Sequence, residues 1–138
     1  MTNEFWLNLP VKEVGKAVEF FRAIGFAFNE NFPQTENSAC LQLGKKGLIV
    51  MLFDYETFAG FAQNAPPETG TEVLISFDAE SREEVDKTAK LVENAGGTIF
   101  AAPANVQGWM YGFGFVDLDG HRWNMAYMDF SKMPNPQN

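Results

Sequence analysis

The chain has 138 residues, 46% of them hydrophobic and 14% aromatic, which suits one domain with a sizeable buried core. Its 18 acidic residues outnumber its 10 Lys and Arg residues, and the net charge of −8 would repel the phosphate backbone of a nucleic acid. Its apolar runs are far shorter than the roughly 20 residues of a membrane-spanning helix. With a single Cys and no recognisable leader, we expect a cytoplasmic protein without disulfides.

The first half predicts a strand, a helix and a hairpin. Residues 5–11 form a short apolar strand, and apolar residues then recur at helical spacing from Val14 to Ile24, until Gly25 ends the helix. Residues 39–43 and 48–53 are two further strands joined by a turn at residues 44–47. This first module spans about residues 4–54.

A connector of about residues 55–71 separates the two halves. Tyr55, Phe58 and Phe61 stand near helical spacing and predict a short helix, which Pro66 and Pro67 interrupt. A lid, a dimer contact and a plain connector are all compatible with this segment.

The second half repeats the order of the first. Residues 72–77 predict a strand, the sequence SREE at residues 81–84 is a capping box, and Gly96 and Gly97 end the helix that follows. After a Pro- and Gly-containing loop at residues 101–108, a hairpin joins residues 111–116 to 121–128 through a turn at 117–120. The second module spans about residues 72–129, and residues 130–138 form a tail whose last six residues are expected to be disordered. The sequence therefore predicts one α+β domain, residues 1–138, made of two βαβββ modules.

Several short motifs resemble the vicinal-oxygen-chelate superfamily, which includes glyoxalase I, bleomycin-resistance proteins and extradiol dioxygenases. They are NLPV at residues 8–11, FFRAIGF at 20–26, SREEV at 81–85, MYG at 110–112 and the closing hairpin FVDLDGHRWNMAYMD at 115–129. They are most similar to bacterial proteins described as predicted lactoylglutathione lyases. The resemblance implies a U-shaped, curved mixed sheet with helices on its convex side, and a homodimer.

In the metalloenzymes of this superfamily, four strand positions in the trough of the sheet hold a divalent metal. Counting from the turns and strand ends assigns these positions to Asn8, Met51, Ser76 and Asn124. None of the four is the imidazole or carboxylate ligand that a catalytic metal prefers. The single His excludes extradiol cleavage, which needs two His and a carboxylate around iron. Lactoylglutathione lyases use a metal-bound Glu as the base, and this chain has Asn124 at that position.

Strand parity also predicts which side chains line the trough. If Val116 pairs with His121, Arg122 and Asn124 share a face with the aromatic residues of the preceding strand. Cys40 is predicted to be an apolar lining residue of the trough rather than a nucleophile, since no His partner is predictable. His121 should lie on the opposite face as a structural or solvated residue. Leu7, Leu9, Val73 and Trp123 should face the helices. The predicted lining residues are Trp6, Cys40, Gln42, Phe53, Tyr111, Phe113, Phe115 and Arg122.

These features favour a metal-independent protein that binds a small apolar or aromatic molecule in the trough, with no cofactor. The alternative is a lyase or isomerase similar to lactoylglutathione lyase, with a non-standard or absent metal site. A third hypothesis is that the trough is filled by side chains and the protein acts through its dimer surface. The residues do not identify a ligand or substrate.

Overall fold

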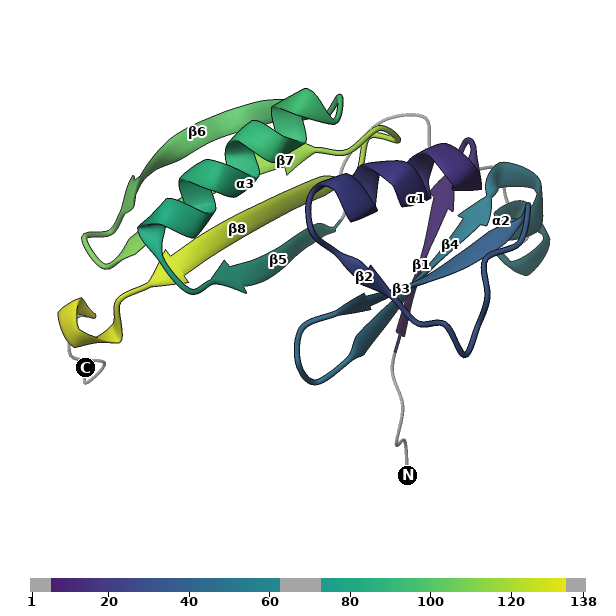
Figure 1. Ribbon diagram of the computed structural model, residues 1–138, viewed down its shortest axis with the longest axis horizontal. Coiled ribbons are helices and arrows are strands. Elements are labelled where there is room, and N and C mark those ends of the chain that lie inside the picture. The colour runs from purple at the N-terminus through teal and green to yellow at the C-terminus, as the bar shows by residue number, and fades with distance from the viewer. Residues whose placement is uncertain (1–5, 63–72, 134–138) are drawn as a thin grey trace. The chain divides into compact units, whose positions relative to one another are not determined.

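The computed structural model describes residues 6–62 and 73–133, and the chain divides into two compact units, residues 1–70 and 71–138. The first unit contains β1 (Trp6–Val11), α1 (Val14–Ala23), β2 (Ala27–Phe28), β3 (Ser38–Leu43) and β4 (Leu48–Asp54), followed by α2 (Tyr55–Ala62). Its sheet has the order β1-β4-β3-β2, with β1 parallel to β4 and the other pairs antiparallel (Figure 1).

The core of the first unit lies between α1 and one face of this sheet. Val14, Val18 and Phe21 recur along one side of α1 and are buried, and Leu41 and Val50 on the strands are fully buried. The helix ends where Gly25 adopts a left-handed backbone conformation with φ 101°, which favours glycine. The helical spacing that predicted α1 therefore corresponds to the face that it buries.

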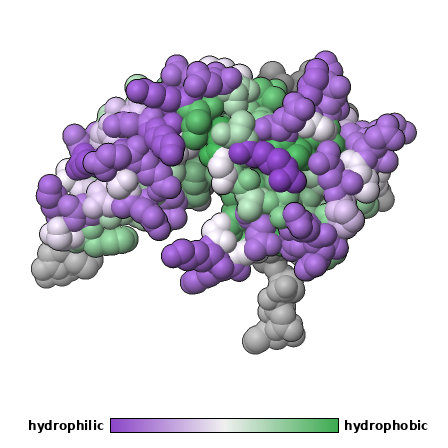
Figure 2. Space-filling model, viewed as in Figure 1, coloured by the Kyte–Doolittle hydropathy of each residue, from purple (hydrophilic) through white to green (hydrophobic). Residues whose placement is uncertain are grey.

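The second unit repeats the arrangement with β5 (Leu74–Ala79), α3 (Arg82–Asn94), β6 (Thr98–Val106), β7 (Met110–Val116) and β8 (Arg122–Met128), in the order β5-β8-β7-β6. Ser81 caps α3 by accepting a hydrogen bond from the Glu84 backbone N–H at 3.1 Å, as the capping box predicts. In Figure 1 α3 lies across its own sheet, and Figure 2 shows hydrophilic residues over its outer surface. Two βαβββ modules in an α+β fold are therefore confirmed.

Two local predictions are wrong. The segment at 101–108, expected to be a loop, continues β6 as far as Val106, with irregular register between Ile99 and Ala104. Pro103 fits there because β6 is an edge strand whose ladder is already interrupted. Val73, expected in the core, precedes β5 and is 53% exposed.

The short helix predicted in the connector is α2, which begins at Tyr55 and is preceded by Asp54, whose carboxylate accepts a hydrogen bond from the Thr57 N–H at 2.9 Å. The predicted break at Pro66 and Pro67, and the tail at 134–138, lie outside the described residues. A short 3₁₀ turn, Phe130–Lys132, follows β8. None of the described helices is long and apolar enough to cross a membrane.

Candidate functional site

The predicted site residues of the first unit share one face of its sheet. Asn8 on β1 is paired with Met51 on β4, and Cys40 on β3 is paired with Met51 from the other side, as the predicted Leu43:Leu48 turn requires. Since side chains alternate along a strand, these three share a face, which we call the Asn8 face. The other predicted lining residues of this unit, Trp6, Gln42 and Phe53, also belong to the Asn8 face by strand parity.

The Asn8 face is more exposed than its opposite. Trp6 is 52% exposed and the Asn8 side chain is exposed, whereas Val50 and Leu52 on the α1 side are fully buried. Phe53 packs edge-on against Phe61 of α2, with ring centroids 4.9 Å apart. The Asn8 face therefore combines polar and aromatic groups, and α2 contacts it at Phe53.

In the second unit the predicted register of the closing hairpin is wrong by one residue. Val116 pairs with Arg122 rather than with His121, so Phe115 lies opposite Trp123 and Asn124 lies opposite Gly114. A slip of one residue exchanges the two faces of a strand. The aromatic residues of β7 predicted to line the trough consequently lie on the face that α3 covers; they are Tyr111, Phe113 and Phe115.

Each of these three side chains has a role in packing the sheet against α3. Phe115 is fully buried and stacks on Trp123 at 6.2 Å between centroids, and Phe113 is stacked on Phe115 at 5.5 Å. The Tyr111 hydroxyl donates a hydrogen bond to the Asp86 carboxylate of α3 at 2.6 Å, which raises the pKa of the phenol. They therefore belong to the core of this unit and its rim.

The register is set by Asp117, whose carboxylate organises the turn. Its Oδ1 accepts hydrogen bonds from the backbone N–H groups of Asp119 and His121 at 2.9 and 3.0 Å, and its Oδ2 accepts one from Trp123 Nε1 at 3.0 Å. A backbone hydrogen bond from the Asp117 N–H to the His121 carbonyl closes a five-residue loop. The sequence suggested four turn residues because the Asp-Gly pair resembles a tighter turn, and nothing in it revealed this buried acceptor.

The opposite face of this sheet, the Asn124 face, contains Ser76, Asn124 and Arg122. Ser76 on β5 is paired with Asn124 on the parallel strand β8, so both family ligand positions of this unit lie side by side as predicted. The Phe100 ring covers Gly114, where any side chain would overlap it, and the Arg122 guanidinium lies 4.6 Å from the Phe100 ring centroid. Phe100 could not be predicted from the sequence, because the irregular register of β6 determines the direction of its side chain.

Asn124 carries the one buried side-chain N or O atom of the described residues that lacks a hydrogen-bond partner, its Oδ1. Most buried polar atoms in proteins are hydrogen-bonded, and an unsatisfied acceptor costs about 1–3 kcal/mol. The Asn124 Oδ1 is therefore an unsatisfied hydrogen-bond acceptor at a family ligand position.

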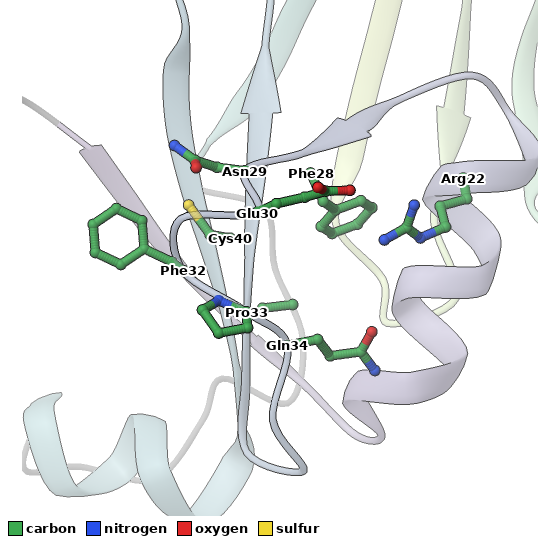
Figure 3. A pocket seen from close by; sticks show the side chains of 9 residues that line it. Arg22, Phe28, Asn29, Glu30, Phe32, Pro33, Gln34 and Cys40 are labelled. Carbon is green, nitrogen blue, oxygen red and sulfur yellow. The ribbon is translucent and has the colours of Figure 1, made fainter.

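Cys40 also contacts a cavity of about 280 Å³ in the first unit, between the end of α1 and the segment that joins β2 to β3 (Figure 3). Its side chain is 2% exposed, and this burial raises the pKa of the thiol. Cys40 is therefore protonated and weakly nucleophilic at neutral pH, which agrees with an apolar lining residue.

The four family ligand positions do not fit a catalytic divalent metal. Asn8, Met51, Ser76 and Asn124 provide amide, thioether and hydroxyl groups, which bind Zn²⁺, Ni²⁺ and Fe²⁺ poorly. Within residues 6–62 and 73–133, no three His, Cys, Asp or Glu side chains are grouped so that they could hold a metal ion.

Comparison with known proteins agrees with this fold. The family model described as bleomycin resistance protein-like N-terminal matches residues 5–44. A hypothetical protein from S. aureus is 33% identical with a TM-score of 0.82, and the match covers 92% of this chain and 95% of that one. A search of curated proteins gave no match.

Two more distant structures share the fold. A glyoxalase/bleomycin resistance protein/dioxygenase family enzyme from Burkholderia phytofirmans PsJN is 19% identical with a TM-score of 0.77, covering 89% of this chain and 96% of that one. The fosfomycin resistance protein FosX from Listeria monocytogenes, solved with Mn(II) and sulfate, is 17% identical with a TM-score of 0.70, covering 96% and 94%. The chain is thus of one family with the S. aureus protein, its residues 5–44 match the bleomycin resistance protein-like N-terminal model, and it has the fold of the glyoxalase/bleomycin resistance/dioxygenase structures.

Proposed function

We propose that this protein binds a small molecule without a metal, and that the ligand donates a hydrogen bond to Asn124. The single observation that supports this most directly is the buried Oδ1 of Asn124, which lacks a partner. A ligand N–H or O–H group that donates to this atom would remove the cost of the unsatisfied acceptor. The removal of this cost would contribute to the free energy of binding.

The surroundings of Asn124 favour a ligand with an apolar or aromatic body. The Phe100 ring lies on the same face and is 43% exposed, and Leu74 on β5 is 51% exposed. Ser76 and Arg122 add a hydroxyl and a guanidinium on the same face. Ligand sites in proteins commonly combine an apolar surface with a few fixed polar groups of this kind.

A thermal-shift screen with small aromatic amides, amines and phenols tests the proposal. A molecule that binds only the native state must raise the unfolding temperature in a concentration-dependent way. The matched variants are Asn124→Leu, which removes the acceptor, and Asn8→Leu, which changes an exposed amide on the other unit. We expect stabilisation of the wild type and of Asn8→Leu, but not of Asn124→Leu. Equal stabilisation of all three proteins would refute the role of Asn124.

Metal content gives an independent test. Protein purified without chelator should contain far less than one Ni, Zn, Fe or Mn atom per chain by elemental analysis, because the donor set is unsuitable. A stoichiometric metal would overturn the proposal. It would favour the lactoylglutathione lyase-like alternative, which predicts turnover of the methylglyoxal and glutathione hemithioacetal.

The expected homodimer and the cytoplasmic location stay predictions. Light scattering coupled to gel filtration should give twice the 15.4 kDa of one chain if the protein dimerises, and fractionation of cells that express the protein tests the location. A drug-sequestering version of the function predicts tight binding of bleomycin, and unchanged bleomycin sensitivity of expressing cells would contradict it.

A further inference from the structure

The cavity of the first unit is a second candidate binding site. Its volume is about 280 Å³, and none of Asn8, Met51, Ser76 and Asn124 lines it. The volume approaches the lower end of small-molecule sites, roughly 300 Å³. Its chemically distinct lining groups are Arg22, Phe28, Glu30, Phe32, Gln34 and Cys40.

The cavity combines charged groups with an apolar lining. Arg22 comes from the last turn of α1 and its guanidinium lies 4.9 Å from the centroid of the Phe28 ring. Glu30 lines the same cavity, and Figure 3 shows its side chain extending from the segment after β2 whereas that of Arg22 extends from α1. Ala39 on β3 shares a face with Leu41, the partner of Phe28, and it is 1% exposed and supplies an apolar surface.

The charged groups of the cavity have no partner of opposite charge among the described residues, although Arg22 contacts the Phe28 ring. Within the described residues, neither Arg22 nor Glu30 forms an ion pair or a side-chain hydrogen bond, and the Gln34 amide forms none either. A guanidinium recognises a carboxylate through two parallel N–H donors, and a carboxylate recognises an ammonium group. A ligand with one charge alone would be attracted by one of these residues and repelled by the other, so charge balance favours a zwitterion.

We propose that this cavity binds a small zwitterion of the α-amino acid class with an apolar side chain. The ligand carboxylate contacts Arg22, its ammonium group contacts Glu30, and its side chain lies against Phe28 and Ala39. This site is independent of the Asn124 face.

Thermal unfolding with phenylalanine, leucine and methionine tests the proposal. We expect a concentration-dependent rise of the unfolding temperature at up to about 10 mM amino acid. Phenylalanine methyl ester lacks the carboxylate and N-acetylphenylalanine lacks the ammonium group, and each should bind at least about tenfold more weakly than phenylalanine.

Variants separate this site from other sources of stabilisation. Arg22 and Glu30 are exposed, so Arg22→Gln and Glu30→Gln should fold and should each weaken phenylalanine binding at least about tenfold. The matched controls Lys45→Gln and Glu19→Gln change exposed charges outside the cavity and should leave it unaltered. Asn124→Leu should also keep the response, which distinguishes this site from the one proposed above. No stabilisation by any of the three amino acids, or an unchanged response of Arg22→Gln, would overturn the proposal.

Discussion

Replacing Asn124 by Leu should stabilise the ligand-free protein. The side chains have nearly the same size, and the change removes a buried acceptor that has no partner. Leaving such a group unsatisfied costs about 1–3 kcal/mol, and an apolar group of the same shape avoids this cost. We therefore expect the free energy of unfolding of Asn124→Leu to rise by about 1–3 kcal/mol.

The assay is urea and thermal unfolding of ligand-free protein, with the wild type and Asn8→Leu measured in parallel. In a chain of this length, each kcal/mol corresponds to a shift of about 3–5 °C in the midpoint. Asn8 is exposed and occupies the corresponding family position of the first unit, so its replacement should change stability by no more than about 0.5 kcal/mol.

A loss of stability in Asn124→Leu would refute the reasoning, because it would mean that the amide already has a donor in the folded protein. A gain of stability together with retained ligand binding would contradict the functional part alone. The same variant thus tests the unsatisfied acceptor and its proposed use separately.

The remaining predictions concern the elements that hold the second module and the thiol of the first. Asp117→Asn should lower the free energy of unfolding by about 2–3 kcal/mol, measured by equilibrium denaturation. The Asp117 carboxylate accepts hydrogen bonds from three N–H groups, and in Asn an NH₂ group replaces one of the two acceptor oxygens. Ser81→Ala should cost about 1 kcal/mol through loss of the α3 cap, and a change below the error of the urea midpoint would contradict the role of the cap. Native Cys40 should react with iodoacetamide at least about 100-fold more slowly than in urea-unfolded protein. Burial raises the pKa of the Cys40 thiol in the folded protein above its value in the unfolded protein, about 8.5. The contribution of the protonated thiol to the free energy of unfolding is therefore fully present below about pH 8.5 and is lost as pH rises through the pKa of the folded state. The variant Cys40→Ala should remove this pH dependence, and an unchanged slope would disprove it.

The element order could be predicted because the apolar spacing and the turn signals agree in both halves. The helices α1 and α3 each follow the period that their buried faces require, and Gly25 and Ser81 mark a helix end and a helix start by local chemistry. Strand β6 was missed because Pro103 and the neighbouring glycines resemble a loop, and only its place at the sheet edge makes Pro acceptable.

The candidate site could be predicted only in part. The register of the first hairpin followed from its turn, so Cys40 was assigned correctly beside Met51. In the second hairpin the turn is one residue longer, because Asp117 folds inward to the Trp123 indole, and sequence spacing cannot reveal a buried side-chain acceptor. The cavity beside Arg22 was missed altogether, since its lining comes from a helix end, an irregular segment and a strand.

Asn124 lies on the face opposite Trp123, as predicted, although the pairing used to predict its neighbours was wrong, and the reason is physical. Trp123 is fully buried and tied to Asp117, so the next residue along β8 must point to the opposite face whatever strand β7 places beside it. The neighbours of Asn124 then change from three aromatic rings to Gly114, covered by Phe100. Compared with a carboxylate ligand, the Asn124 amide can still accept a hydrogen bond but lacks the negative charge that favours metal binding. A buried acceptor with no partner is costly in the free protein, and the ligand proposed above would recover this cost by supplying the donor.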